Sequence, residues 1–517
     1  MTKHIFRSAI IIAAIAGLQS CGLNEQLGST LTRKDADSVI TVPLLLRGAY
    51  DNLQLPYQEF SNSWGLSQMS TDETLGPTRA GDWDDNGVWR SLHEHSWNAD
   101  HAHIQATFTN LLTLQFSATN VLNFKPSNNE AAQARFLRAF SMFTVLDLWG
   151  QVPFRNPTDT LLNKPRVMKA NEALDYIIAE LTAIMPDLGA RPATAAYVAN
   201  QDAARFLLMK CYLNKGAFLN RAAPTFDAAD MQKVITLADQ IKGTGAYSLA
   251  TDYFDNFARD NDVKSTENIF TQQNGPGLST VRNGNATYGR WKFTLHYNQT
   301  PSGWNGFTTL SDFYNKFEAS DRRRGGAYTG VTDTSGLLVG FLIGQQYDAH
   351  HNALKDRNGN PLIFTPEVQL KETNKATLEV TGIRVIKYPP DFYTSKKSTE
   401  NNEASNDYVF FRYADVLLMK AEALLRTGDA GSALSLVNGI RTARGATTLG
   451  TLDLNALLDE RGRELYWEGW RRQDLIRFGK FLQPWQLKPN DNPRNLLFPI
   501  PTSDLAVNTN LVQNPGY

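Results

Sequence analysis

Residues 412–444 read RYADVLLMKAEALLRTGDAGSALSLVNGIRTAR and contain two apolar, helix-forming stretches with a short break between them. The pattern predicts one helix over 412–426 and a second over 430–444, interrupted at Gly428 and Asp429. Ala421, Ala423 and Ala433 are small enough to let the two helices approach closely. The pair has the size of one helix–turn–helix repeat of the tetratricopeptide kind, which predicts a mostly helical fold.

Other parts of the chain also show helical spacing of apolar residues. The strongest case is 128–150, where Phe136, Phe140 and Phe143 recur at helical intervals and Gly150 and Pro153 end the pattern. The remaining predicted helices cover 38–55, 171–188, 201–219, 228–242 and 452–478. No exact repeat recurs, so a regular solenoid is not predicted.

Two regions differ in composition from these helices. Residues 61–97 are rich in Gly, Asp and Trp, and residues 265–407 are rich in Gly, Asn, Thr and aromatic residues. Such segments are typical of long loops with short strands, and Asp356-Arg357-Asn358-Gly359 predicts a hairpin turn. We therefore expect a helical part over 38–260 and a second part over 261–517, in which a loop-rich, short-stranded insertion (265–407) precedes helices within 412–478.

The amino terminus has the features of a secretion signal. Lys3 and Arg7 precede an apolar run over 9–18, which is too short to cross a bilayer. Leu18-Gln19-Ser20-Cys21 resembles the lipobox of bacterial lipoproteins, in which the Cys becomes the first mature residue and carries acyl chains. This predicts a signal peptide over 1–20, lipidation at Cys21 and a tether over 21–37. An ordinary signal peptide with a chance Cys nearby is the alternative.

The overall composition narrows the possible functions. The 517 residues carry a formal net charge of −1 without a basic block, which argues against nucleic-acid binding and polybasic membrane docking. The chain contains only two Cys residues. If Cys21 is acylated, no internal disulfide can form, and Cys211, within an apolar helical run, is predicted to be a buried, inert thiol.

Five blocks in order resemble the SusD/RagB family of nutrient-uptake outer-membrane lipoproteins. They are 134–140 leading into 148–153, 412–423 leading to 437–441, 460–477, 497–501 and 513–517. The resemblance implies a SusD-like fold with tetratricopeptide-like helical repeats and an irregular ligand-binding face. It also implies a position on the cell outer membrane, capping a SusC-like TonB-dependent transporter. Members bind glycans or peptides without acting on them chemically. Residues 22–26 contain one acidic residue, so the acidic surface-export signal associated with such lipoproteins is poorly matched.

Aromatic residues in the two loop-rich regions are the candidate ligand-binding groups. Sugar rings present flat C–H faces that lie well on an indole, while their hydroxyls need polar partners nearby. Trp83 and Trp304 are the first choices, because both sit near Gly in turn-rich sequence. The full predicted set is Trp83, Trp304, Trp291, Tyr297, Arg79, Asp82 and Asn305. The alternative for each Trp is simple core packing, the role assigned to Trp149, Trp467, Trp470 and Trp485.

Charged and histidine-rich segments are given structural roles. Residues 460–477 are expected to form an ion-pair network, with Glu468 pairing with Arg472, Asp474 with Arg471 or Arg477, and Arg441 or Arg444 compensating the acidic residues. His93, His95, His101 and His103 are interpreted as a polar cluster rather than a zinc site. Residues 82–87 begin like a calcium loop, but its twelfth position is His93, where a bidentate Glu is required. No catalytic residue, metal or cofactor is predicted.

Three functions remain in competition. The first is a non-enzymatic lipoprotein that captures oligosaccharide, or peptide, and passes it to the transporter. The second is a surface-anchored glycan hydrolase that would use two carboxylates from Asp72, Glu73, Asp82, Asp84 and Asp85. The third is a helical scaffold that binds only protein.

Overall fold

The computed structural model describes residues 41–159, 163–275, 288–392 and 404–517. Residues 42–517 form one compact unit. The predicted signal peptide, Cys21 and the whole of the predicted tether lie outside the described residues. Across the described ranges, no helix is both long and apolar enough to span a bilayer.

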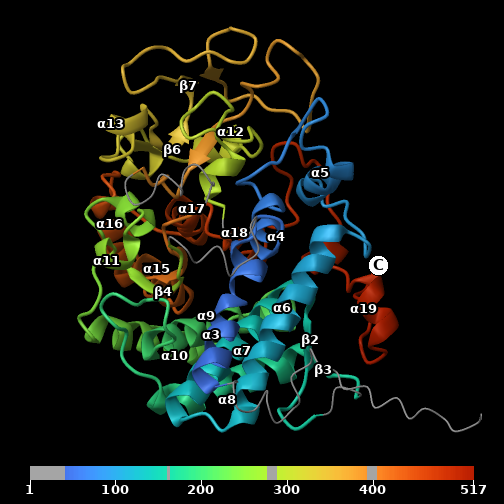
Figure 1. Ribbon diagram of the computed structural model, residues 1–517. Coiled ribbons are helices and arrows are strands. Elements are labelled where there is room, and N and C mark those ends of the chain that lie inside the picture. Colours follow the sequence, from blue (N-terminus) through green and yellow to red (C-terminus); the bar gives the residue numbers. More distant parts are fainter. Residues whose placement is uncertain (1–40, 160–162, 276–287, 393–403) are drawn as a thin grey trace, which may run out of the picture. The chain divides into compact units, whose positions relative to one another are not determined.

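Long helices build one end of the compact unit, and each packs against the next along the chain (Figure 1). They are α3 (Val42–Asp51), α6 (Ala102–Val121), α7 (Asn128–Trp149), α8 (Ala170–Ile184), α9 (Gln201–Leu219) and α10 (Ala228–Gly243). Helix α10 then packs on α15 (Tyr413–Arg426), and α15 on α16 (Ala430–Ala443). The result is the mostly helical, tetratricopeptide-like arrangement that the sequence predicts.

Helix α7 illustrates how local sequence sets these elements. Ser127 and Glu130 form a reciprocal capping box at its start, which satisfies free backbone N–H groups. Gly150 ends the helix with a φ of +74°, a conformation that glycine adopts without steric cost. The buried face includes Phe136, Phe140 and Phe143, as the spacing predicts.

Other helix predictions had mixed outcomes. The bounds of α9, α15 and α16 confirm the predictions to within a residue or two. The single helix predicted over 452–478 is wrong: the chain forms α17 (Leu454–Leu465) and α18 (Arg471–Arg477) with a turn between them. Trp467 and Gly469 adopt positive φ values of 61° and 82° in this turn, which interrupts the helix. Helix α6 was not predicted.

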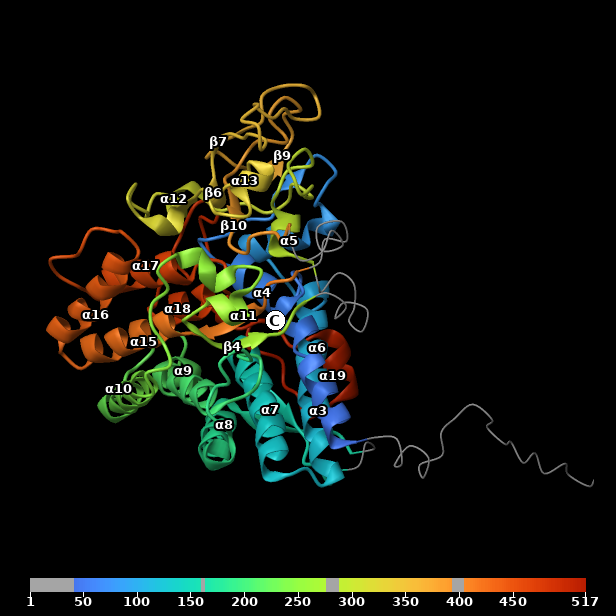
Figure 2. The ribbon, with the colours of Figure 1, turned by 60° about the vertical axis from the view of Figure 1, so that its left-hand side comes forward.

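Most of the insertion consists of short strands and turns at the end of the unit opposite the long helices, whereas its first strand, β4 (Asn268–Gln272), lies beside α9 (Figure 2). Strand β1 (Thr78–Arg79) pairs in parallel with β9 (Lys371–Glu372), and this joins the first loop-rich region to the insertion. A three-stranded antiparallel sheet has the order β10-β6-β5. The remaining two-stranded pairs are antiparallel: β2 with β3, β4 with β11, and β7 with β8. The predicted hairpin turn at 356–359 is confirmed by an antiparallel bridge between Lys355 and Pro361.

Short strands and short helices link the larger elements. The strands are β2 (Gln151–Phe154), β3 (Arg166–Lys169), β4 (Asn268–Gln272), β5 (Gly325–Gly326), β6 (Val339–Leu342), β7 (Gly344–Gln345), β8 (Ile363–Phe364), β10 (Arg384–Ile386) and β11 (Tyr408–Arg412). The short helices are η1 (Gln54–Gln58), α4 (Ser63–Met69), η2 (Asp85–Gly87), α5 (Val88–His93), η3 (Leu122–Phe124), η4 (Met185–Asp187), η5 (Tyr253–Phe257), α11 (Asn261–Lys264), η8 (Arg290–Phe293), α12 (Ser311–Tyr314), η9 (Arg322–Arg324), α13 (Thr332–Ser335), η10 (Pro493–Leu496) and α19 (Thr502–Val507).

A large hydrophobic core runs through both ends of the unit. Trp149 and Trp467 are fully buried in it, and Trp470 and Trp485 pack against it, which confirms their assignment to packing. Cys211 is also fully buried, and this burial raises the pKa of its thiol above the ordinary value. The thiol is therefore unreactive, as predicted.

Candidate functional site

Trp83 and Trp304 lie in contact, although 221 positions separate them in the sequence. The indole Nε1 of Trp83 donates a hydrogen bond to the backbone oxygen of Trp304 at 2.9 Å, and the ring centroids are 6.3 Å apart. Both side chains are partly exposed. Trp83 follows β1, and Trp304 lies between η8 and α12, so the two loop-rich regions meet here. We call this pair the tryptophan patch.

Packing beneath the tryptophan patch holds both indoles in place. Phe307 lies 4.8 Å from Trp83 and Phe293 lies 5.6 Å from Trp304, measured between ring centroids. A Cβ atom built on Gly306 would lie 2.4 Å from Cε2 and Cζ2 of Trp83, so the indole fills the space that a side chain there would need. Trp83 itself has a φ of +59°, a conformation that persists only where the surroundings impose it. The patch is therefore preorganised.

Tyr297 and Asp82 lie beside one another near the patch. The Tyr297 hydroxyl donates to Oδ2 of Asp82 at 3.0 Å. Burial, and then the Asp82 carboxylate, raise the pKa of Tyr297 to about 12, so the phenol stays protonated. The guanidinium of Arg357 lies 3.9 Å from the Tyr297 ring centroid and pairs with Glu379. Arg357 was missed from the sequence, although it sits in the predicted hairpin turn.

His296 anchors the segment that carries Tyr297. Its Nδ1 accepts from the backbone N–H of Asn298 at 3.0 Å, so Nε2 carries the proton and donates to Glu379 at 2.9 Å. Burial lowers the pKa of His296 to about 4, which keeps the ring neutral near pH 7. Glu379 thus connects His296 with Arg357, and these contacts fix the position of the Tyr297 loop.

The other predicted site residues lie beneath the surface. Arg79 is 2% exposed and donates to the backbone oxygens of Leu378 and Thr381. Asn305 is 1% exposed and accepts from Arg384, and Trp291 is 2% exposed. These three side chains brace the loops from inside. The groups that reach solvent are Trp83, Trp304, Tyr297 and Asp82, joined by Arg357.

The acidic residues considered for hydrolysis have structural partners. Asp72 pairs with Arg471 at 2.7 Å. Glu73 is 1% exposed, and burial raises its pKa to about 8. Asp85 accepts from Trp89 at 2.8 Å, and Asp84 pairs with Arg90 at 2.8 Å. These contacts give the loop its shape.

The rings of His101 and His103 lie against each other with centroids 5.5 Å apart, whereas His93 and His95 contact other parts of the chain. His93 faces the backbone oxygens of Thr74 and Gln486, whereas His95 pairs with Asp491 at 2.7 Å. Across the described residues, no group of three or more His, Cys, Asp or Glu side chains is placed to hold a metal ion.

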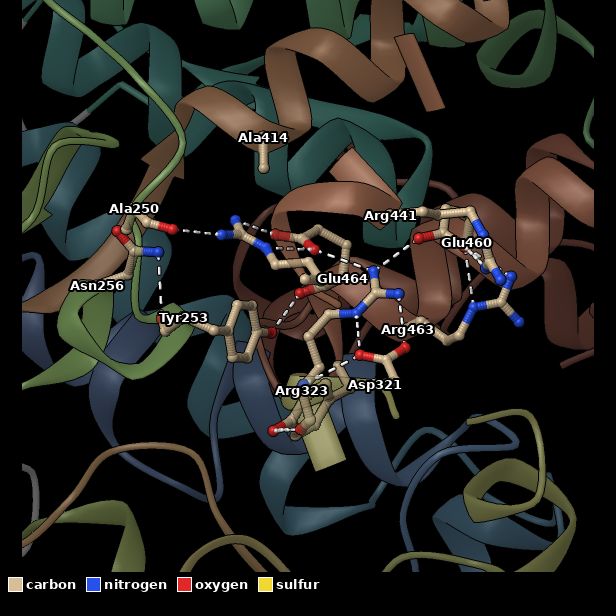
Figure 3. A network of polar contacts seen from close by, with 12 residues as sticks. Ala250, Tyr253, Asn256, Asp321, Arg323, Ala414, Arg441, Glu460, Arg463 and Glu464 are labelled. Carbon is tan, nitrogen blue, oxygen red and sulfur yellow. Dashed lines mark hydrogen bonds and ion pairs between the residues drawn. The ribbon is translucent and has the colours of Figure 1, made fainter. Parts of the chain in front are cut away.

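The predicted ion-pair network is confirmed, and it is buried. Glu464 pairs with Arg412 at 2.7 Å, Arg444 at 2.8 Å and Arg323 at 3.1 Å. Figure 3 shows Glu464 and Arg323 within it, and beside them Glu460, which pairs with Arg323, Arg441 and Arg463. Because the network joins the insertion to α16 and α17, it ties the two ends of the unit together.

Two predicted details of the network have different outcomes. The pairing of Asp474 with Arg477 is confirmed at 2.6 Å. The pairing of Glu468 with Arg472 is wrong, because Glu468 binds Arg412 and Lys387 instead, at 2.8 and 2.9 Å. The Arg472 guanidinium lies over the ring of Phe498 and donates to backbone oxygens.

The structure thus combines tetratricopeptide-like helices with a loop-rich insertion that carries the preorganised tryptophan patch. The chain belongs to the SusD family, whose model matches residues 238–492. The starch-binding protein SusD of Bacteroides thetaiotaomicron is 26% identical, in an alignment covering 100% of this chain and 99% of that protein.

Solved structures share the fold. The surface glycan-binding protein A from Bacteroides thetaiotaomicron, in complex with laminarihexaose, has a TM-score of 0.68 at 18% identity and covers 92% of this chain and 98% of its own. A laminarin-binding SusD-like protein has a TM-score of 0.68 at 19% identity, with 92% and 99% covered.

Proposed function

We propose that this chain captures oligosaccharides without cleaving them and delivers them to a SusC-like TonB-dependent outer-membrane transporter. The observation that carries the proposal is the tryptophan patch, which presents two partly exposed indoles held by a hydrogen bond and by packing from below. Relatives named for binding starch and glycans support a carbohydrate as the ligand. Peptide is the second ligand class that the family resemblance leaves open.

The chemistry of the patch suits a sugar. An indole face accepts the C–H face of a pyranose ring, and such aromatic contacts are worth roughly 0.5–1.5 kcal/mol beyond the area they bury. Asp82 and Arg357 lie close to the patch. The Asp82 carboxylate can accept hydrogen bonds from sugar hydroxyls, and the Arg357 guanidinium can donate hydrogen bonds to them. A preorganised apolar surface with a few polar groups is typical of sites that bind small ligands.

The acidic residues considered for hydrolysis make contacts that stabilise the fold, which favours binding without cleavage. Asp72, Asp84 and Asp85 are each engaged by a neighbouring Arg or Trp, and Glu73 is buried. The starch-binding and laminarin-binding relatives carry names that describe binding. We therefore propose that the protein is not an enzyme.

The proposal includes the location of the protein. Cleavage after residue 20 would make Cys21 the first residue, and acyl chains there would hold the protein at the outer membrane through the tether over 21–37. Two or more acyl chains anchor stably, whereas a single chain binds only marginally. The helical parts over 38–260 and 261–517 would then sit beside the membrane and next to the transporter.

Isothermal titration with a glycan panel tests this function. The panel contains starch, laminarin, xylan, mannan and pectin together with their oligosaccharides. We expect the unaltered protein to bind at least one of them, and Trp304→Ala or Trp83→Ala to weaken that binding by roughly 1–3 kcal/mol. Phe116→Ala is the control, because Phe116 is 47% exposed on α6, outside the patch.

Three results would count against the proposal. Unchanged affinity in both tryptophan variants would show that the patch is not the site. Release of shortened sugars during incubation, detected by chromatography, would show that the protein is a hydrolase. Binding of no glycan in the panel would remove carbohydrate capture altogether.

A further inference from the structure

A cavity of about 440 Å³ lies in the insertion, and none of the residues of the tryptophan patch lines it. Its walls come from residues 327–329, from α13 and the residues that follow it, and from the first part of the ribbon of residues 344–364 that pairs β7 with β8. A volume of this size falls within the range of small-ligand sites, about 300–1,000 Å³. The cavity is therefore large enough to hold sugar residues.

The lining combines apolar walls with polar groups. Tyr347 is 45% exposed and Leu338 is 41% exposed, so an aromatic and an aliphatic side chain both reach the cavity. Thr329, Asp333 and His351 add hydroxyl, carboxylate and imidazole groups. Within the described part of the chain, neither the Tyr347 hydroxyl nor the His351 ring forms a hydrogen bond. Both remain available to the hydroxyl groups of a ligand.

The floor of the cavity is tightly packed. Gly336 ends α13 with a φ of +76°, and a Cβ built there would lie 2.3 Å from the backbone oxygen of Asp348. Only glycine permits this approach, so α13 and the ribbon are held together. The cavity is a built feature of the fold.

One ribbon contributes residues to both the cavity and the tryptophan patch region. Arg357 lies over Tyr297, and Asn298 Nδ2 donates to the Lys355 oxygen at 2.9 Å. Tyr347 and His351 of the same ribbon line the cavity. In Figure 1 this ribbon, with β7, lies at the end of the unit opposite the long helices.

A second, smaller cavity of about 210 Å³ adjoins the first. The two cavities share Tyr328 and Thr329 in their linings, so they lie next to each other. Two neighbouring cavities with mixed apolar and polar walls suit a chain of sugar units better than a single compact molecule.

We propose that the cavity lined by Tyr347 is a second carbohydrate site, which holds another part of the polysaccharide chain bound at the tryptophan patch. This inference rests on the proposed function, since it assumes that the ligand is a glycan. Two sites on one body bind a long chain more tightly than either alone, because the second contact forms within the same complex. A short oligosaccharide held at the patch gains nothing from the second site.

Two measurements test the inference. Affinity electrophoresis in gels containing starch or laminarin measures binding of the polysaccharide, and isothermal titration measures binding of the matching trisaccharide. Tyr347→Ala removes an exposed side chain whose hydroxyl forms no hydrogen bond within the described residues, so we expect the variant to fold. Ile363→Ala is the matched control, since Ile363 is 44% exposed on the same ribbon but does not line the cavity. Leu338→Ala gives a second, independent change to the lining.

We expect Tyr347→Ala to weaken binding of the polysaccharide at least about fivefold and to leave trisaccharide binding unchanged. Trp304→Ala should weaken both, and the double variant should retain less polysaccharide binding than either single variant. If Tyr347→Ala and Leu338→Ala bind the polysaccharide as tightly as Ile363→Ala does, the second site is overturned. The proposal that the tryptophan patch binds glycan would still stand. If the unaltered protein binds neither glycan nor any other panel member, the proposed function and this inference both fail.

Discussion

Gly306→Ala should disable the tryptophan patch through a single methyl group. The added Cβ would lie 2.4 Å from two atoms of the Trp83 indole and 2.8 Å from the backbone oxygen of Phe293. Ordinary carbon–carbon contacts are about 3.5–4.0 Å, so the indole has to move by about 1 Å or more. That movement breaks the 2.9 Å hydrogen bond from Trp83 to the oxygen of Trp304.

The magnitude follows from these contacts. Overpacking of this kind costs about 1–3 kcal/mol of folding free energy. Loss of a stacking platform costs roughly 1–3 kcal/mol of binding free energy, which is about a 5- to 150-fold rise in the dissociation constant. We therefore expect Gly306→Ala to weaken glycan binding nearly as much as Trp83→Ala does.

Isothermal titration measures the affinity, and thermal unfolding checks that the variant remains folded. Gly81→Ala is the control, because Gly81 lies two residues before Trp83 and a Cβ there meets nothing within 4 Å. We expect this control to bind and unfold like the unaltered protein. A folded Gly306→Ala variant with an affinity within twofold of the unaltered protein would refute the reasoning.

Further predictions concern stability, pH and location. Glu464→Gln should lower the free energy of unfolding by about 3–5 kcal/mol in chemical denaturation, because it leaves buried Arg charges without a carboxylate partner. The control Glu172→Gln removes a carboxylate from an exposed pair and should change the free energy of unfolding by under about 1 kcal/mol. Equal losses in the two variants would contradict this prediction. His296 has a pKa of about 4 in the folded protein, below the ordinary value of about 6.5. As the pH is lowered from about 6.5 to about 4, the unfolded state therefore takes up the proton first. The free energy of unfolding should fall by up to about 3 kcal/mol over this range. His296→Gln should reduce that slope, and an unchanged slope would show that another group causes it. Cys21→Ala should move the protein from the membrane pellet to the supernatant in fractionation, and continued pelleting would argue against lipidation.

Helices with regular apolar spacing were predictable from the sequence, and those that depend on tertiary contacts were not. Helices α7 and α9 show clear periodicity and end signals, so their bounds were predicted closely. Helix α6 contains many Thr, Gln and Asn residues, which weaken the helical pattern, and it is stabilised by packing on α7. The turn at 466–470 depends on positive φ at Trp467, which sequence does not signal for a Trp.

The candidate site was predictable in part. Turn-rich surroundings singled out Trp83 and Trp304, but their contact across 221 positions emerges only in three dimensions. Trp291 has a similar local context, yet it is 2% exposed, because Gly289 allows the chain to close over its indole. Arg357 reaches Tyr297 only because the β7–β8 ribbon folds toward it.

A crystal structure of the protein with the oligosaccharide that binds most tightly in the panel tests the capture of glycans most directly. We predict an intact sugar chain with a pyranose ring stacked on the indole of Trp83 or Trp304. An oligosaccharide bound elsewhere with the two indoles bare, or a chain cut into shorter products, would contradict the account.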